Sequence, residues 1–500
     1  MRLGIDFGTS FSLPATSYMG DETILLPSGT YGIPSVFYYD EEDDNVLIGQ
    51  EAEDAGQGDQ ARNLKREIKM ELNSTFRAGS KTFTGKQIVG HILCKVKEVA
   101  LDTARQKLIE DSLEGVIISV PPAFEHNEKL FIKQAASIPV NEGGPGLNVL
   151  GFIKEPVAAA LAYFKEPLAN QTKILVYDLG GGTCDIAVVE AKDTLDERFV
   201  VLDSRTLRIG GKDWDAKLAE YITSELENQG LRIRGKRALE EKVLRAAIKA
   251  KHSFSEKLGT SYRDRVRARV ELDGQLKQVQ ITRDTLENLT GGLLQKTIQM
   301  IKDVLSNPSC NGVNTIICVG GSCNMPQVRV ALEKAFLGKG IEEIKLYEPE
   351  KAIALGAAIY ASKYDGDDVV AGGDAFLTDF ASFSYGTKVK SNGKSIIDNL
   401  ILKGDKLPIT VERVYYTVCD NQYSVDFNIY ESLNSNSLCE IEDVPSSPII
   451  EANLVLGHDT PEGAELHAKL TLTVDGLLEI FADDLKGNKL HAETKLNFSR

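Results

Sequence analysis

Residues 174–190 read ILVYDLGGGTCDIAVVE, and they explain more of this chain than any other stretch. Two runs of β-forming residues flank a glycine turn, a pattern that predicts an antiparallel hairpin. The three consecutive glycines carry no Cβ atoms, so the backbone N–H groups of the turn can approach an anion closely. Asp178 and Asp185 stand at the two shoulders of the turn, where carboxylates repel an anion unless a metal ion lies between them.

Magnesium bound to a nucleotide triphosphate would explain this combination, because Mg²⁺ prefers oxygen ligands and keeps several water molecules. The hairpin is therefore interpreted as a site for phosphate and magnesium. The alternative at this point is a plain glycine turn with two solvated aspartates.

The first residues of the chain repeat the same pattern. Residues 1–12 read MRLGIDFGTSFS, in which a short strand leads to Asp6, Gly8 and the hydroxyls of Thr9 and Ser10. Two such motifs in one chain suggest a duplicated domain whose halves each bring a hairpin to a shared cleft.

Both motifs resemble the phosphate-binding segments of the actin-like ATPase superfamily. More narrowly, they are similar to the 70-kDa heat-shock chaperones (Hsp70, DnaK-like), whose segments read close to IGIDLGTT and DLGGGTFD. The resemblance implies an α/β actin-like, two-lobed ATPase made of duplicated ribonuclease-H-like halves, followed by an all-β sandwich. We expect the ATPase domain at 1–364, an interdomain linker at 365–379 and a peptide-binding sandwich at 380–500.

Composition agrees with a globular protein of several domains. The chain has 500 residues, of which 42% are hydrophobic and 26% charged. A net charge of −16 argues against nucleic acid or an anionic membrane as the main partner. Seven scattered cysteines indicate a reducing compartment, and the amino terminus shows no signal peptide. The expected location is the cytoplasm.

Two further segments match the family between the hairpins. Residues 63–66 read NLKR within a predicted helical stretch, and Lys65 falls where the family has a lysine beside the γ-phosphate. Glu155 precedes Pro156 at a predicted helix start, in a segment similar to the family's NEPTAAALAY. The resemblance implies that Glu155 lies near the attacking water, whereas the simpler interpretation is an ordinary N-terminal helix cap.

Later segments resemble the parts of the family that hold the rest of the nucleotide. Residues 209–215 read IGGKDWD, a glycine pair before a helix, and residues 319–322 read VGGS after a strand. Three positions depart from the family at the adenosine end, namely Ile248, His252 and Asn324.

These matches predict a site of three parts. The predicted catalytic residues are Lys65, Glu155, Asp178 and Thr183. The predicted nucleotide-binding residues are Gly8, Thr9, Ser10, Gly180, Gly181, Gly182, Thr183, Gly210, Gly211, Lys251, Ser255, Gly320, Gly321, Ser322 and Glu350. Mg²⁺ is expected at Asp6, Asp178 and Asp185, largely through water, and K⁺ is a further candidate cation.

The last 120 residues show many short strand patterns separated by turns, which is typical of a β-sandwich. The resemblance implies that this part binds extended apolar polypeptides through Tyr415, Val425, Phe427 and Leu477. These residues could equally be sandwich core. The family continues into a helical lid, which nothing after Leu496 could form, so the chain looks like a lidless or truncated member.

The predicted function is that of an Hsp70-like chaperone, which hydrolyses ATP slowly to ADP and phosphate and so controls the binding of unfolded polypeptides. A J-protein and a nucleotide exchange factor are candidate partners, and no nucleic acid or membrane partner is expected. One alternative is a lidless co-chaperone or exchange factor that binds nucleotide with little turnover. A sugar or glycerol kinase of the same superfamily is a second alternative, but it would leave the β-rich end unexplained.

Overall fold

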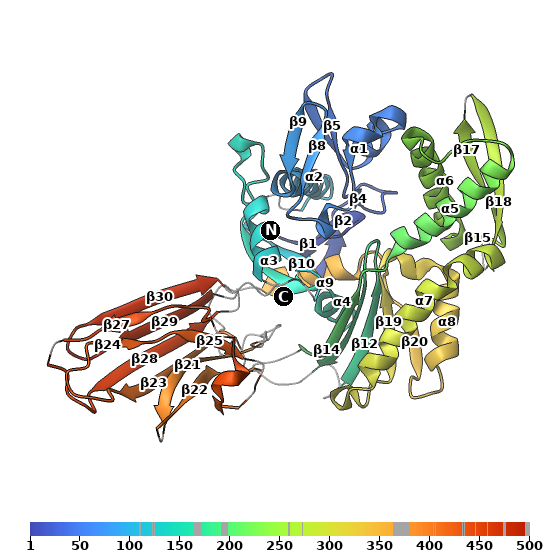
Figure 1. Cartoon of the computed structure of the whole chain (residues 1–500). Helices are drawn as coiled ribbons and strands as arrows, with labels where there is room; N and C mark the ends of the chain where they lie inside the picture. The colour runs from blue at the N-terminus through green and yellow to red at the C-terminus, as the bar shows by residue number, and fades with distance from the viewer. Residues whose placement is uncertain are drawn as a thin grey trace. The chain divides into compact units, whose positions relative to one another are not determined.

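The computed structural model describes residues 1–495 except 110, 111, 123, 125, 165–171, 192–198, 259, 260, 273, 364–380, 382, 392, 404, 406, 433, 435, 446, 458 and 474–476. The chain forms two compact units (Figure 1). Unit 1 comprises Met1–Phe124 and Glu128–Leu377, and unit 2 comprises Glu125–Asn127 and Thr378–Arg500. The predicted linker at 365–379 lies outside the described residues, so the predicted domain boundaries stay a prediction.

The first large sheet of unit 1 contains the N-terminal hairpin. Its strands are ordered β11 (Val149–Lys154), β10 (Gly115–Val120), β1 (Arg2–Phe7), β2 (Phe11–Tyr18) and β3 (Asp21–Ile24), with β4 (Ile33–Pro34) also paired to β2. Strands β11, β10 and β1 are parallel, whereas β1, β2 and β3 pair antiparallel. Strand β10 is buried along its whole length.

The second large sheet repeats this arrangement around the central hairpin. Its order is β20 (Glu343–Leu346), β19 (Thr315–Val319), β12 (Thr172–Leu179), β13 (Cys184–Ala191) and β14 (Phe199–Leu207). The first three strands are again parallel, and the last two are again antiparallel. The predicted hairpin is confirmed, and its register places Asp178 directly opposite Asp185.

Two helices fill the space between the sheets. Helices α4 (Glu155–Tyr163) and α9 (Ala352–Lys363) share one apolar core with residues of both sheets. They approach closely, because a Cβ atom on Gly356 would lie 1.8 Å from the carbonyl oxygen of Ala158. A Cβ atom on Gly4 would likewise meet the backbone of Ala358 at 2.1 Å. The small residues of α4 and α9 thus bring the two sheets, and the ends of their hairpins, to a fixed separation.

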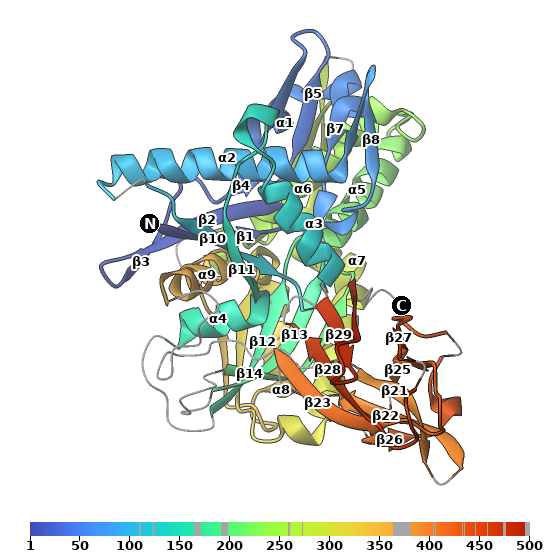
Figure 2. The same ribbon diagram turned by 90° about the vertical axis from the view of Figure 1, so that its left-hand side faces the viewer.

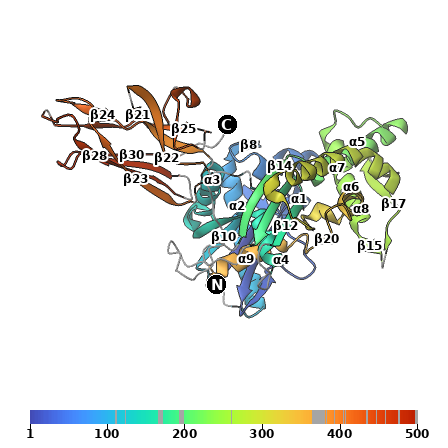
Figure 3. The ribbon, with the colours of Figure 1, turned by 90° about the horizontal axis from the view of Figure 1, so that it is seen from below.

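The remaining helices cover the outer faces of the sheets. Helix α2 (Gly85–Gln106) runs along the first sheet (Figure 2) and shares its core. Helix α7 (Arg283–Leu305) packs against β13 and β14 and against α8 (Pro326–Phe336), which also contacts β20 (Figures 1 and 3). The other described helices are α1 (Gln50–Ala55), α3 (His126–Ala136), α5 (Gly211–Asn228) and α6 (Arg237–Ser255), with 3₁₀ turns η1 (Gly58–Asn63), η2 (Ile68–Met70), η3 (Val140–Glu142), η4 (Pro308–Cys310) and η5 (Gly321–Asn324).

Small sheets complete unit 1. They are formed by β5 (Phe37–Asp40) with β6 (Asn45–Ile48) and β7 (Leu64–Lys65), β8 (Thr75–Ala78) with β9 (Lys81–Thr84), β15 (Lys257–Leu258) with β16 (Ser261–Tyr262), and β17 (Arg265–Leu272) with β18 (Gln275–Thr282). The helical stretch predicted through 63–66 is wrong. Helix α1 ends where Gly56 and Gly58 make helix continuation unfavourable, and Lys65 instead lies on β7, paired with Phe37.

Unit 2 consists of two four-stranded antiparallel sheets over one apolar core. One sheet is ordered β25 (Ile429–Ser432), β21 (Ser384–Ser391), β22 (Lys394–Ile401), β26 (Leu438–Cys439). The other is ordered β23 (Ile409–Tyr416), β28 (Glu465–Leu472), β29 (Leu477–Asp483), β30 (Lys489–Lys495). A short pair, β24 (Ser424–Asp426) and β27 (Asn453–Val455), and the 3₁₀ turn η6 (Ile441–Asp443) complete its described elements. In β28 and β29 buried and more exposed residues alternate, as expected when one face packs on a core.

Candidate nucleotide site

The turns of the two predicted hairpins meet. A Cβ atom built on Gly181 would lie 2.0 Å from Oγ of Ser10, and one on Gly182 would lie 2.9 Å from Cγ2 of Thr9. Only residues without a side chain permit so close an approach of the two turns. The structure therefore brings together the two motifs that the sequence places far apart.

The loop before α5 closes onto the same turn. The backbone N–H groups of Gly211 and Lys212 donate to the carbonyl oxygens of Gly180 and Gly181, both at 2.9 Å. A Cβ atom on Gly210 would lie 2.6 Å from backbone atoms of Gly181. These contacts use the first N–H groups of α5 to hold its N-terminus against the glycine turn, where the helix dipole favours an anion.

The segment after β19 reaches the turn through a side chain. Oγ of Ser322 donates to the carbonyl oxygen of Gly180 at 2.9 Å. Gly320 has φ +83°, a conformation that favours glycine, and a Cβ atom there would lie 2.3 Å from Oδ1 of Asp178. All four glycine-rich segments predicted from the sequence thus converge on one place.

Four carboxylates lie around these turns. Asp6 ends β1 and accepts a hydrogen bond from Oγ of Ser119 at 2.9 Å, while Asp185 accepts from Oγ1 of Thr206 at 2.6 Å. Asp178 faces Asp185 across the hairpin, and Glu155 begins α4.

The pKa values of three of these acids are raised, first because the acids are buried and second because they lie close to one another. Burial, followed by the charge of Glu155, raises the pKa of Asp6 and that of Asp185 to about 6. Burial and the same neighbours raise the pKa of Asp178 well above its usual range. Buried carboxylates that lie this close together are characteristic of a cation site, since an added positive charge would return the raised pKa values toward normal.

The buried cation of the cluster is Lys69, which sequence reasoning missed. Its Nζ lies 2.6 Å from Oε1 of Glu155, and both side chains are nearly inaccessible to solvent. Burial alone would lower the pKa of Lys69, but the charges of Glu155 and Asp6 outweigh it and raise the pKa. The carboxylate of Glu155 thus forms an ion pair with this lysine. It does not cap α4, which has no side-chain capping hydrogen bond at its N-terminus.

Lys65, the predicted lysine, is not brought into the cluster. It forms an ion pair with Glu71, whose side chain is 58% exposed. The chain changes direction between the two lysines, because Glu67 takes a left-handed backbone conformation (φ +58°) before η2. A signal in the sequence could have distinguished them: Lys69 is flanked by Ile68 and a methionine, an apolar setting, whereas the neighbour after Lys65 is an arginine.

The residues predicted to hold the far end of the nucleotide lie on neighbouring elements. Nζ of Lys251 is 2.7 Å from Oδ2 of Asp215 and also donates to the carbonyl oxygen of Gly211 at 2.9 Å. Lys251 therefore fastens α6 to the start of α5. Oγ of Ser255 donates to the carbonyl oxygen of Lys251 at 3.3 Å.

Glu350 accepts a hydrogen bond from Nδ2 of Asn324 at 3.0 Å. Burial raises the pKa of Glu350. The asparagine that departs from the family pattern is therefore in direct contact with a predicted nucleotide-binding residue.

The predicted peptide-binding residues fall into two groups. Tyr415 and Val425 are half-buried, and the hydroxyl of Tyr415 donates to Oδ2 of Asp398 at 2.9 Å. Phe427 is only 1% exposed and lies in the sandwich core, with its ring centroid 5.9 Å from that of Tyr415. Leu477, half-buried, begins β29. Phe427 thus lies in the core, the alternative that the sequence left open, while the other three keep some exposure.

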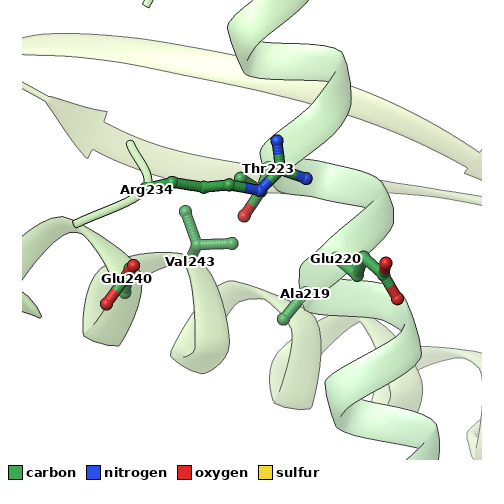
Figure 4. A pocket seen from close by; sticks show the side chains of 6 residues that line it. All are labelled: Ala219, Glu220, Thr223, Arg234, Glu240 and Val243. Atoms are coloured by element: carbon green, nitrogen blue, oxygen red, sulfur yellow. The ribbon is translucent and has the colours of Figure 1, made fainter. Parts of the chain in front are cut away.

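A cavity of about 370 Å³ lies in unit 1 between α5 and α6 (Figure 4). It is lined by Ala219, Glu220, Thr223, Arg234, Glu240 and Val243. None of these is a predicted site residue, and the guanidinium of Arg234 is already ion-paired with Glu227. This cavity is distinct from the hairpin site.

Within the described residues, no helix is long and apolar enough to cross a membrane.

The fold and the site together define an α/β unit, in which two glycine-turn hairpins meet beside a cluster of carboxylates, and a β-sandwich unit. The model of the Hsp70 protein family matches residues 59–496, so the chain belongs to the Hsp70 family, a family of ATP-hydrolysing chaperones.

Similar proteins of known name belong to the same family. The chaperone protein DnaK of Thermotoga neapolitana is 29% identical over 97% of this chain and 79% of its own length. That of Thermosipho africanus is 27% identical over 97% of this chain and 78% of its own. That of Halobacterium salinarum is 28% identical over 96% of this chain and 73% of its own. The predicted family is confirmed.

Proposed function

We propose that the hairpin site of this chain binds ATP with Mg²⁺ and hydrolyses it slowly, and that the nucleotide state controls how unit 2 binds extended apolar polypeptides. The observation that carries the proposal is the convergence of both glycine turns on a cluster of four carboxylates that holds the buried Lys69–Glu155 pair. A purely structural core would not concentrate four acids around one lysine.

The phosphates of ATP would lie between the turns. Backbone N–H groups of the two turns, with the hydroxyls of Thr9, Ser10 and Thr183, provide donors on one side. On the other side lies the start of α5, whose first N–H groups bind the glycine turn and whose dipole favours negative charge.

The carboxylates fit a magnesium ion, since Asp6, Asp178 and Asp185 are buried together near a single lysine, Lys69, and burial raises their pKa values. Asp6, Asp178 and Asp185 would hold Mg²⁺, largely through its water shell. When bound, the ion neutralises charge on the phosphate oxygens.

The Lys69–Glu155 pair would act on the attacking water. The carboxylate of Glu155 would accept a hydrogen bond from the water and so orient the water toward the γ-phosphorus. Lys69 stays protonated, so its ammonium stabilises the negative charge that develops during the transfer. We therefore propose Lys69, rather than Lys65, for the role assigned to a lysine in the sequence.

The matched order and sense of the two large sheets favour the finer architecture predicted from the sequence, an actin-like ATPase made of duplicated ribonuclease-H-like halves. Each sheet presents its hairpin to the site, and α4 and α9 join the sheets. A movement of one half against the other would then differ between the ATP and ADP states and would change how unit 2 binds a polypeptide.

The half-buried Tyr415, Val425 and Leu477 are proposed to contact an extended polypeptide in unit 2, which would also pair with strand edges. Phe427 would support them from the core. A J-protein and a nucleotide exchange factor remain candidate partners, and the cytoplasm, the setting typical of this family, is the proposed location.

A second function has one specific observation in its favour. Asn324, where the family usually has an arginine, donates to Glu350 at the adenosine end of the site. Together with Ile248 and His252, it leaves open a co-chaperone or exchange factor that binds nucleotide with little turnover.

Isothermal titration with ATP and Mg²⁺, run alongside a phosphate-release assay on the same protein, separates the two functions. The proposed chaperone binds ATP and releases phosphate slowly. Binding without phosphate release on the scale of hours would favour the co-chaperone, and no binding at all would contradict both.

A further inference from the structure

The outer face of the sandwich carries three metal-ligating side chains that the proposed function does not use. Glu479 lies on β29, and His491 and Glu493 lie on β30 (Figure 1). One ligand atom from each of the three residues lies within 4.8 Å of the others. We propose that these residues form a surface site for a divalent transition metal of the zinc class.

The strand register explains why these side chains face one another. Glu479 is directly opposite Glu493, and Phe481 is directly opposite His491. Because side chains alternate along a strand, these four residues point to the same face. Leu478 and the other alternate residues of β29 point into the core, so the backbone beneath the three ligands is held firmly.

Electrostatics favours a cation at this place. Two glutamates directly opposite each other on neighbouring strands repel and destabilise the pair. Within the described part of the sandwich, neither Glu479 nor Glu493 is ion-paired with a lysine or arginine. The nearby Lys469, opposite Phe481, is paired with Glu412 at 3.5 Å. A bound metal ion would remove the repulsion.

The imidazole decides the class of metal. The ring of His491 stacks on Phe481, with centroids 4.1 Å apart and an interplanar angle of 6°, which limits the orientations of the imidazole. One nitrogen and two carboxylate oxygens suit Zn²⁺, Co²⁺, Ni²⁺ or Cu²⁺, whereas Mg²⁺ and Ca²⁺ prefer oxygen alone. Three protein ligands leave a position for water or for a group from another molecule.

Equilibrium dialysis of the full chain against Zn²⁺, without nucleotide and after removal of metal with a chelator, tests the site. The variants are His491→Ala, Glu493→Gln and, as a matched control, His467→Ala. His467 is partly exposed on the same face, 3.9 Å from Glu465 and directly opposite Asp483, but among the described residues it belongs to no group of three ligand atoms within 4.8 Å of one another. Far-UV circular dichroism checks that each variant is folded.

The wild type and His467→Ala are expected to bind one zinc equivalent more than His491→Ala. Glu493→Gln is expected to bind that equivalent more weakly than the wild type. A large excess of Mg²⁺ should not displace the zinc from the wild type. Equal zinc binding by the wild type and His491→Ala would overturn the proposal. So would displacement by Mg²⁺, which would indicate an acidic patch that does not need the imidazole. Neither outcome depends on ATP hydrolysis, so the result stands apart from the proposed function.

Discussion

Lys69 and Lys65 are four positions apart, and only Lys69 lies in the carboxylate cluster. We expect Lys69→Met to lower the single-turnover rate of ATP hydrolysis by about 10²–10³-fold, the loss typical when a preorganised charge at a transition state is removed. Lys65→Met is the matched control and should stay within a few-fold of the wild type.

Because Lys69→Met leaves Glu155 buried without its partner, the loss must be separated from unfolding. The double variant Lys69→Met/Glu155→Gln removes both charges and should regain thermal stability without regaining hydrolysis. Recovery of hydrolysis in the double variant would contradict the role proposed for the lysine.

The second prediction at this scale concerns pH. The pKa of Asp185 is raised to about 6 in the folded chain, so below its unfolded value near 4 the carboxyl is neutral in both states. Between pH 4 and pH 6 the carboxyl is ionised in the unfolded chain but still protonated in the folded chain, so folding takes up a proton. The free energy of unfolding therefore falls as the pH rises through this range. In EDTA we therefore expect Asp185→Asn to be more stable than the wild type by roughly 2–3 kcal/mol at pH 7.5. The difference should shrink toward pH 5.

Chemical denaturation at several pH values measures this difference. The amide introduced by Asp185→Asn would keep an acceptor for Thr206, whose hydroxyl now donates to the aspartate, so the change mainly removes the charge. A difference that stays constant from pH 5 to 7.5 would show that the carboxyl is not under the strain described.

At the scale of elements, the glycine contacts hold the loops together. Gly210 has no room for a Cβ atom, since it would lie 2.6 Å from the backbone of Gly181. Gly210→Ala should push the loop before α5 away from the glycine turn and weaken ATP binding by at least about tenfold, equivalent to 1.4 kcal/mol. Isothermal titration measures the change.

Gly291 offers the control. It lies inside α7, and nothing lies within 4 Å of an added Cβ atom. Gly291→Ala should leave ATP binding unchanged and stabilise the helix by about 0.5–1 kcal/mol. A similar loss of ATP affinity in both variants would show that the tight packing at Gly210 is not the cause.

A charged network links the segment around α1 to α6. Arg66 donates to both carboxylate oxygens of Glu53, at 2.8 and 2.7 Å, and to Glu241 at 2.8 Å. Arg245 donates to Glu241 and to the carbonyl oxygen of Gly56. These half-buried contacts join the half of unit 1 that contains the first large sheet and α1 to the half that contains the second large sheet and α6, and they are worth more than exposed pairs.

Arg66→Ala should accelerate ADP release several-fold, because one connection across the two halves is lost. Arg62→Ala is the matched control, since Arg62 is 62% exposed and pairs only with Glu41 on its own half. Stopped-flow release of a fluorescent ADP analogue compares the two. Equal rates in Arg66→Ala and the wild type would mean that this network does not limit release.

At the scale of the whole molecule, the sequence predicted what depends on local pattern. The hairpin with Asp178 opposite Asp185 and the helix that begins at Glu155 are both present, because glycine turns, β-forming runs and a proline at a helix start act over a few residues. The family follows from these motifs and their order along the chain.

Tertiary packing decided what the sequence could not predict. The apolar neighbours of Lys69 favour its burial, but its position beside Glu155 depends on the left-handed turn at Glu67 and on pairing of β7 with β5, neither of which is encoded in a recognisable pattern. The burial of Phe427 likewise depends on how two sheets stack, since alternation alone does not distinguish core from cleft.

The central claim is that this chain hydrolyses ATP at the hairpin site and that hydrolysis is coupled to peptide binding by unit 2. The most direct measurement is steady-state phosphate release by the full chain with Mg²⁺, with and without an excess of a short leucine-rich peptide, with Lys69→Met as the baseline. Our account predicts slow release above this baseline, and faster release when the peptide is present. Release by the wild type that never exceeds that of Lys69→Met, with or without peptide, would contradict it.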